Sequence, residues 1–302
     1  MKRILLAFSL LAAMTVHGQI LNVTSIERLD APGEKDQVSL AVAISPKGDY
    51  LLLSTDTKQG LVKWDLNTGQ TQIITTDEGT GSNVLISNDG KMVVYSQVSY
   101  KDKRRHEAVQ AFDLTKGKRQ TLLKPSRKLQ GVDIQGTTAA VMNDGQLKTH
   151  ALNGNAKSLS RPMLSHHHLK LYVTTGGETK LLAPNGTEEH YIWASLSPDG
   201  KRVLYYVSGK GTFVCDVDGS NVISMGNLTA PKWLNNNIIV GMDETDGEYT
   251  IIASRIIART LDGVQQVLTE DDIIATYPLP SAQSGKIVFS TPDGQIYLIT
   301  IE

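Results

Sequence analysis

Four features of the sequence contain residue types that do chemistry in other proteins. Ser197 to Gly200 (S-P-D-G) joins a hydroxyl to a carboxylate, and His166 to His168 offers three imidazoles. Asp243 to Glu248 is an acidic run, and Cys215 is the single cysteine. Each has a competing structural explanation, because the same residue types also form turns and fill cores.

The histidine and acidic stretches were considered as metal sites. Adjacent residues of a strand point to opposite faces, so the three histidines cannot all ligate one ion, and a polar turn is favoured. Asp243, Asp246 and Glu248 supply the oxygens that Ca²⁺ prefers, but without the spacing of an EF-hand. We therefore expect a solvated hairpin turn, keep these three carboxylates as weak calcium candidates, and expect no bound metal or other cofactor.

Catalytic arrangements have little support in the sequence. No G-x-S-x-G nucleophile elbow occurs, which argues against a serine peptidase of the prolyl-oligopeptidase kind. The sialidase box ends in Thr-Trp, whereas Gly200 is followed by Lys201 and Arg202. Cys215 lies in an apolar strand pattern and is expected to be a small buried hydrophobe. The sequence therefore favours a binding protein over an enzyme.

The S-P-D-G stretch belongs to a repeat. Pro, Asp and Gly in this order favour a reverse turn, which is followed by an apolar strand, a polar turn and a strand that ends near Asp and Gly. This unit spans Ser195 to Gly219 and recurs from Ser45 to Gly69 and from Ser87 to Gly117. The offset of 42 residues between Ser45 and Ser87 matches the length of a four-stranded propeller blade.

The strands that follow these turns are continuous apolar runs such as YLLLS, MVVYS, RVLYYV and KIVFS. A continuous run indicates a strand buried on both faces, as in a propeller blade between two neighbours. No amphipathic helix is evident beyond the N-terminal segment. The sequence therefore predicts an all-β protein, a β-propeller of four-stranded antiparallel blades.

Fainter units begin near residues 136, 236 and 285, and Pro162 to Gly186 has room for three strands. Seven blades are preferred, and six remain possible if Pro162 to Gly186 is an elaboration. Ile20 to Asp30 has no unit of its own, and the last unit has only three strands. We expect the N-terminal strand to complete that last C-terminal blade and close the ring.

The N-terminus has the layout of a secretory signal peptide. Lys2 and Arg3 precede an apolar stretch from Ile4 to Met14, and small residues follow up to Gly18. We expect residues 1–18 to be cleaved, residues 19–302 to form a single propeller domain, and the product to be periplasmic or secreted. No lipobox cysteine and no membrane span are expected. The net charge of −1 argues against nucleic acid as a partner, and we expect a monomer.

With the S-P-D-G-K and S-P-K-G units in view, the chain resembles the TolB-type, WD-like propeller group. The resemblance covers essentially all of the mature chain and is specific in three units. It implies a periplasmic or secreted β-propeller, and for TolB itself it implies protein–protein contacts at the cell envelope. TolB also has an N-terminal α/β domain, which we do not expect here.

Binding is expected where the inner strands approach the central channel. Four aromatic residues precede the turns there: Tyr191, Trp193, Trp233 and Tyr277. Such rings stack on sugars or anchor peptides, although they also wedge neighbouring blades together. The predicted function is an exported, non-enzymatic scaffold that binds a protein, peptide or glycan at the propeller face. The alternative is a channel-mouth hydrolase or lyase, acting on glycan or peptide with residues from several blades.

Overall fold

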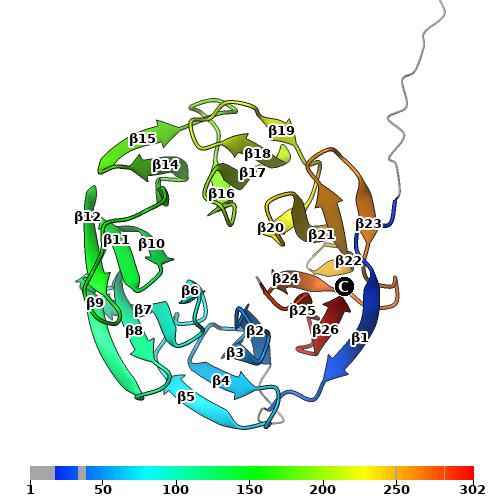
Figure 1. The fold of residues 1–302 in the computed structure, drawn as a ribbon, viewed down its shortest axis with the longest axis horizontal. Helices are drawn as coiled ribbons and strands as arrows, with labels where there is room; N and C mark the ends of the chain where they lie inside the picture. The colour runs from blue at the N-terminus through cyan, green and yellow to red at the C-terminus, as the bar shows by residue number, and fades with distance from the viewer. Residues whose placement is uncertain (1–17, 33–38, 249, 282) are drawn as a thin grey trace, which may run out of the picture.

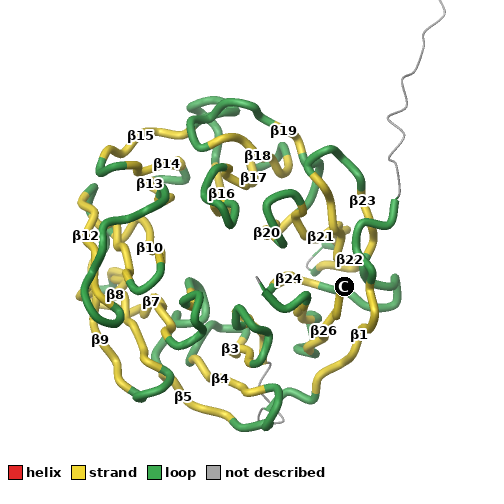
Figure 2. Tube along the Cα trace, viewed as in Figure 1, coloured by secondary structure: helices red, strands yellow, loops and turns green. Residues whose placement is uncertain are grey.

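The structure is a computed structural model that describes residues 18–32, 39–248, 250–281 and 283–302. All the regular elements in these ranges are β-strands, and they form a ring of seven antiparallel sheets (Figures 1 and 2). The described part of the chain contains no helix able to cross a membrane. Residues 1–17 of the predicted signal peptide lie outside the described residues.

The sheets are numbered here as blades 1 to 7. Blade 1 contains β2 (Ser39–Ile44), β3 (Tyr50–Thr55), β4 (Leu61–Asp65) and β5 (Thr71–Thr75), and blade 2 contains β6 (Val84–Ile86), β7 (Met92–Lys101), β8 (Arg104–Asp113) and β9 (Lys118–Ser126). Blade 3 contains β10 (Leu129–Gln135), β11 (Thr138–Asn143) and β12 (Gln146–Ala151), and blade 4 contains β13 (Met163–His167), β14 (Lys170–Thr175) and β15 (Glu178–Leu182). Blade 5 contains β16 (Tyr191–Leu196), β17 (Arg202–Val207), β18 (Gly211–Asp216) and β19 (Ile223–Ser224). Blade 6 contains β20 (Thr229–Trp233), β21 (Ile238–Asp246), β22 (Ile251–Thr260) and β23 (Gln265–Val267), and blade 7 contains β24 (Thr276–Pro280), β25 (Lys286–Ser290), β26 (Ile296–Ile301) and β1 (Val23–Leu29).

The seven-blade prediction is confirmed, and the segment from Pro162 to Gly186 is a blade rather than an elaboration. The predicted closure is also confirmed, because β1 pairs with β26 from Val23 opposite Ile301 to Leu29 opposite Ile296. Blades 3 and 4 have three strands each. After their third strands the chain runs as a loop, over residues 152–162 and 183–190, directly to the next inner strand.

The S-P-D-G stretch is a structural turn in which Ser197 and Gly200 are buried and Pro198 and Asp199 are exposed. The Ser197 hydroxyl donates to Asp199 Oδ1 at 2.6 Å and accepts from the backbone N–H of Arg202 at 3.0 Å. Gly200 has a φ of +72°, which favours glycine. The Ser45 and Ser87 turns have the same hydroxyl-to-carboxylate bond at 2.6 Å. The recurring motif therefore positions the blades and is not a site.

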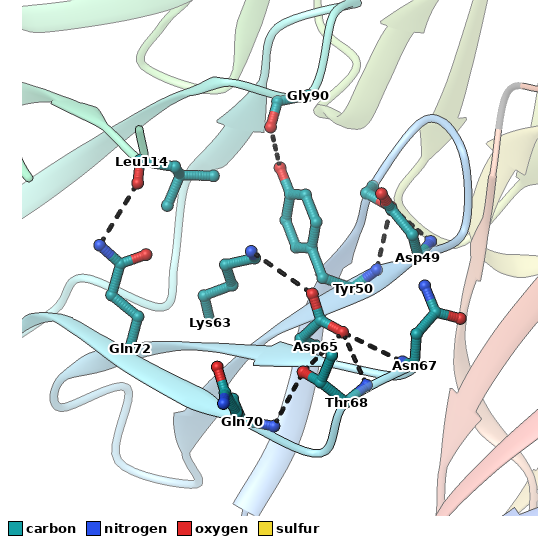
Figure 3. Close-up of polar contacts among 11 residues, drawn as sticks. Asp49, Tyr50, Lys63, Asp65, Asn67, Thr68, Gln70, Gln72, Gly90 and Leu114 are labelled. Atoms are coloured by element: carbon teal, nitrogen blue, oxygen red, sulfur yellow. Dashed lines mark hydrogen bonds and ion pairs between the residues drawn. The ribbon is translucent and has the colours of Figure 1, made fainter. Parts of the chain in front are cut away.

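Neighbouring blades are joined by apolar contacts and by hydrogen bonds. Leu52 of blade 1 and Val93 and Tyr95 of blade 2 are completely buried in one cluster. Tyr50 donates its hydroxyl to the carbonyl of Gly90 at 2.8 Å, one repeat further along the chain (Figure 3). In the same region, Asp65 accepts from the backbone N–H of Thr68 at 2.9 Å and stabilises the turn after β4 (Figure 3).

Candidate functional site

The inner strands that line the ring are irregular. Their pairing with the next strand is interrupted by a bulge in blades 1, 3, 5, 6 and 7. In three successive blades the bulge contains a non-glycine residue with positive φ: Trp193 at +52°, Ala230 at +45° and Tyr277 at +53°. Bulges redirect side chains and often occur beside binding sites, and backbone strain of this kind concentrates at functional positions.

The bulged strands of blades 1, 3, 5 and 6 contribute residues to the wall of a central cavity of about 730 Å³. Residues from six blades line it, so the cavity is the channel of the propeller. Trp193 lines it with 41% of its surface exposed, and its ring stands edge-on to Tyr206 at 5.2 Å between centroids. The ring of Trp193 is therefore available to a molecule in the channel.

Most of the charged groups on the cavity wall are paired. Arg161 forms an ion pair with Asp133 at 3.3 Å and donates to the carbonyl of Ile134 at 3.1 Å. Glu107 is paired with Arg105. These ion pairs and this hydrogen bond fix the positions of the charged side chains on the part of the channel wall formed by blades 2 and 3.

Lys232 is the exception. It follows the bulge of β20 and lines the cavity with its side chain exposed, and no described carboxylate lies within 4.0 Å of its ammonium. Neighbouring atoms of the channel wall desolvate the ammonium, and this desolvation lowers the pKa of Lys232. A cation without a counter-charge in such surroundings is well suited to an anionic ligand.

His166 lies on the wall formed by blade 4. Its Nε2 atom is buried and has no hydrogen-bond partner among the described residues, and burial lowers the pKa of the imidazole. His166 is therefore neutral at pH 7. His168 has a φ of +49° and lies in the turn before β14, so the histidine run does enter a turn as predicted.

The four predicted aromatic residues occupy different environments. Tyr191 is completely buried, donates its hydroxyl to the Gly186 carbonyl at 2.9 Å, and packs beside Tyr205. Trp233 is half-buried and donates Nε1–H to the Ser195 carbonyl at 3.3 Å, which connects blade 6 to blade 5. These two residues wedge the blades together.

Trp193 and Tyr277 are the exposed pair, and they occupy equivalent bulge positions in blades 5 and 7. Tyr277 is 54% exposed but does not line the cavity. Trp233 lies three residues after Ala230, the residue equivalent to Trp193, so the two tryptophans are not at matching positions. Lys232 was not predicted, and its only signal in the sequence is a charged residue in an otherwise uncharged inner strand.

The calcium candidates do not converge. Asp243 is bound to Arg255 at 2.9 Å, and Asp246 and Glu248 are exposed near the end of the β21–β22 hairpin. Across the described ranges, no group of three or more His, Cys, Asp or Glu side chains is close enough to hold a metal ion. Cys215 is completely buried, as expected, and burial raises the pKa of its thiol to about 12.

Fold and channel together define the class of protein: a seven-bladed β-propeller with a central cavity. No family model matches the chain, and no curated protein does. Similar solved structures include a putative TolB from Agrobacterium tumefaciens, with a TM-score of 0.54 and 16% identity, over 89% of this chain and 92% of that one. A β-propeller domain from Myceliophteria thermophila matches with a TM-score of 0.56 and 11% identity, over 93% and 100%.

A third similar structure is an oligogalacturonate lyase in complex with manganese. Its TM-score is 0.50 at 15% identity, over 86% of this chain and 76% of that one. At these identities the comparisons show the fold, which is that of TolB proteins and related propellers.

Proposed function

We propose that this protein is a non-enzymatic binding protein whose channel holds a chain segment, peptide or glycan, that carries a carboxylate. The observation that supports this most strongly is Lys232, which is exposed in the channel without a counter-charge. Trp193 on the neighbouring blade offers a ring face to the same cavity. Together they provide a charge-assisted hydrogen bond and a stacking surface, which is a minimal site for an acidic chain segment.

The energetic contributions of the two groups differ. A hydrogen bond from an ammonium to a carboxylate contributes about 1.5–3 kcal/mol, and it is strengthened where the channel limits access of water. Stacking on an aromatic ring adds roughly 0.5–1.5 kcal/mol beyond the apolar area buried. Loss of either group therefore weakens binding without abolishing the fold, since both side chains lie on the solvent side of the inner strands.

Calorimetry with residues 19–302 tests this proposal. The probes are acidic oligosaccharides and acidic peptides, with their neutral counterparts as controls. Lys232→Met keeps the length of the side chain and removes the charge, and Trp193→Ala removes the ring. We expect each to weaken binding of the acidic probe by about tenfold or more, which corresponds to about 1.4 kcal/mol.

Tyr277→Ala is the matched control, since Tyr277 occupies the equivalent bulge outside the cavity lining. It should bind like the unmodified protein. Equal affinity of Lys232→Met and the unmodified protein for every acidic probe would overturn the proposal. So would a preference for the neutral probes.

A second candidate function is a lyase or hydrolase that acts in the channel. It is supported by the similarity to the oligogalacturonate lyase structure and by the ionisable groups on the cavity wall, Asp133, His166 and Lys232. A lyase creates a new carbon–carbon double bond, which ultraviolet absorbance detects, and a hydrolase creates new reducing ends or amines. Turnover of an acidic oligosaccharide or peptide that is lost in Lys232→Met would replace the binding proposal with the enzymatic one.

We also propose that the protein acts outside the cytoplasm, as a periplasmic or secreted protein. The support is the basic, apolar and small-residue layout of residues 1–18.

A further inference from the structure

Two hairpins of the propeller are longer than the others. One consists of β7 and β8, ten residues each, and the other of β21 and β22, nine and ten residues. Both join the second strand of a blade to the third, and such connections emerge at one face of a propeller because all blades share the same strand order. The two hairpins lie in blades 2 and 6, on opposite sides of the ring (Figure 1).

The β7–β8 hairpin is basic. Its tip carries four exposed cationic residues: Lys101, Lys103, Arg104 and Arg105. Arg127 from the adjacent loop is exposed beside them. Lys101, Arg104 and Arg127 line a surface depression of about 480 Å³, together with His106 and a single acidic residue, Asp102.

The β21–β22 hairpin is acidic. Asp246 and Glu248 are exposed near its tip, and the loop that packs beside it adds three exposed acidic residues at positions 270–272. That loop is held to the hairpin by Ser254, whose hydroxyl donates to the Ala275 carbonyl at 2.6 Å. One cation, Arg255, is shared between Asp243 and Asp271.

Among the described residues, each hairpin also carries one exposed apolar side chain near its tip. Tyr100 is 65% exposed on the basic hairpin, and Ile252 is 59% exposed on the acidic hairpin. Tyr100 pairs with Arg105 two positions from the turn, and Ile252 follows directly after Ile251, the first residue of β22. An apolar centre surrounded by charge is the usual composition of a protein–protein contact.

We propose that this face binds the same face of a second copy of the chain in a two-fold symmetric dimer. A two-fold axis in the plane of the face, perpendicular to the line between the hairpins, places each basic hairpin over the acidic hairpin of the other copy. The charge complementarity is then satisfied twice, as an isologous contact requires. The net charge of −1 adds little overall repulsion between copies. This inference replaces the expectation of a monomer.

Analytical ultracentrifugation of residues 19–302 over a range of concentrations and salt tests the dimer. We expect a dimer in about 0.01 M salt, where the Debye length is about 30 Å, and dissociation in about 1 M salt, where it is about 3 Å. Reversal of the basic tip by Lys103→Glu with Arg104→Glu should weaken the dimer by about tenfold or more. Reversal of the acidic tip by Asp246→Lys with Glu248→Lys should do the same.

The decisive measurement mixes the two charge-reversed variants. Each pair of substitutions removes most of the charge of its hairpin, and a heterodimer of the two variants keeps one unmodified contact between a basic and an acidic hairpin. An equimolar mixture should therefore associate more tightly than either variant alone. Lys47→Glu with Lys201→Glu, in exposed turns of the opposite face, is the control and should leave the dimer unchanged. Circular dichroism verifies that each variant is folded.

Three results would overturn the proposal. The first is a monomer at every concentration in low salt, and the second is a dimer that both reversals leave intact. The third is a mixture of folded variants that does not associate more tightly than either variant alone.

Discussion

Ser197 has no exposed surface, and its hydroxyl lies between the carboxylate of Asp199 and the backbone N–H of Arg202. Removal of a buried hydroxyl leaves both partners without that bond, which costs more than an average hydrogen bond contributes. We expect Ser197→Ala to lower the free energy of unfolding by about 1–3 kcal/mol in urea titrations. The exposed Ser208→Ala is the control, with an expected change within about 0.5 kcal/mol. Equal stability of the two variants would contradict a structural role for the turn.

The same turns predict how stability depends on acid. Hydroxyl hydrogen bonds lower the pKa of Asp89, Asp199 and Asp293 in the folded state. A folded-state pKa below the unfolded value stabilises the protein above the unfolded pKa, about 3.9, and this contribution is lost as the pH falls through the folded pKa. We expect the urea midpoint to be constant between pH 7 and 5 and to fall below about pH 4. Asp199→Asn should show a shallower fall, whereas superimposable slopes would argue against this linkage.

Cys215 provides a test of burial at a single atom. Its thiol is completely buried, and its pKa of about 12 keeps it protonated at neutral pH. We expect no reaction of the folded protein with an aromatic disulfide reagent at pH 8 within minutes, and one thiol per chain after denaturation in guanidinium. Rapid reaction of the folded protein would show that blade 5 opens or that the thiol is accessible.

At the scale of elements, β1 is the strand that closes the ring. It pairs with β26 over six residue pairs, although the two strands lie at opposite ends of the sequence. A chain that begins at Ala31 loses this pairing and exposes the edge of β26. At about 0.5–1.5 kcal/mol for each hydrogen bond, we expect a loss of at least about 3 kcal/mol of stability, with aggregation through the free edge.

The reference for this deletion is a chain that begins at Gln19, the expected processed form, which keeps β1. Thermal unfolding followed by circular dichroism compares the two. Equal melting temperatures would show that β1 does not contribute to closure.

Blades were predictable from the sequence because their signals are local. The turn at Ser197 and the apolar run that follows it each identify an element within a few residues, and their spacing gives the repeat. The missing outer strands of blades 3 and 4 were not predictable, since a polar loop and a short edge strand have similar compositions. The closing strand was predictable only because the last unit lacked a fourth strand.

The site was less predictable than the fold, because bulges change which residues of a strand share a face. Trp193 and Tyr277 have positive φ without being glycine, so nothing in the sequence indicates the bulges. The alternation of a regular strand shows neither that Trp233 and Trp193 occupy different positions nor that Lys232 lines the channel. The burial of Tyr191 could not be predicted from the sequence either, since only the fold brings its ring beside Tyr205.

At the scale of the whole molecule, the channel and the hairpin face meet on β8, where Glu107 of the cavity wall is paired with Arg105 of the basic hairpin. Trp193 and Lys232 lie near the middle of the inner strands, whereas the charged hairpins project from one end of the ring. A dimer through that face leaves the opposite face, with the Ser45, Ser87 and Ser197 turns, free. Ligand binding in the channel is therefore measured both on the dimer and on the charge-reversed variants that weaken it.

The proposed export of the chain concerns the whole protein and is tested with the full sequence. If Lys2, Arg3 and the apolar residues up to Met14 form a signal peptide, the export machinery should recognise them only as a unit. Expressed in a Gram-negative host, residues 1–302 should be recovered in the periplasm or medium with Gln19 as the first residue, as N-terminal sequencing and intact mass would show. Leu10→Arg interrupts the apolar stretch and should keep the unprocessed chain in the cytoplasm, as should a chain that begins at Gln19. Recovery of the intact, unprocessed full-length chain in the cytoplasm would refute export. Because the propeller is identical in all of these forms, any difference in their location comes from the N-terminal residues.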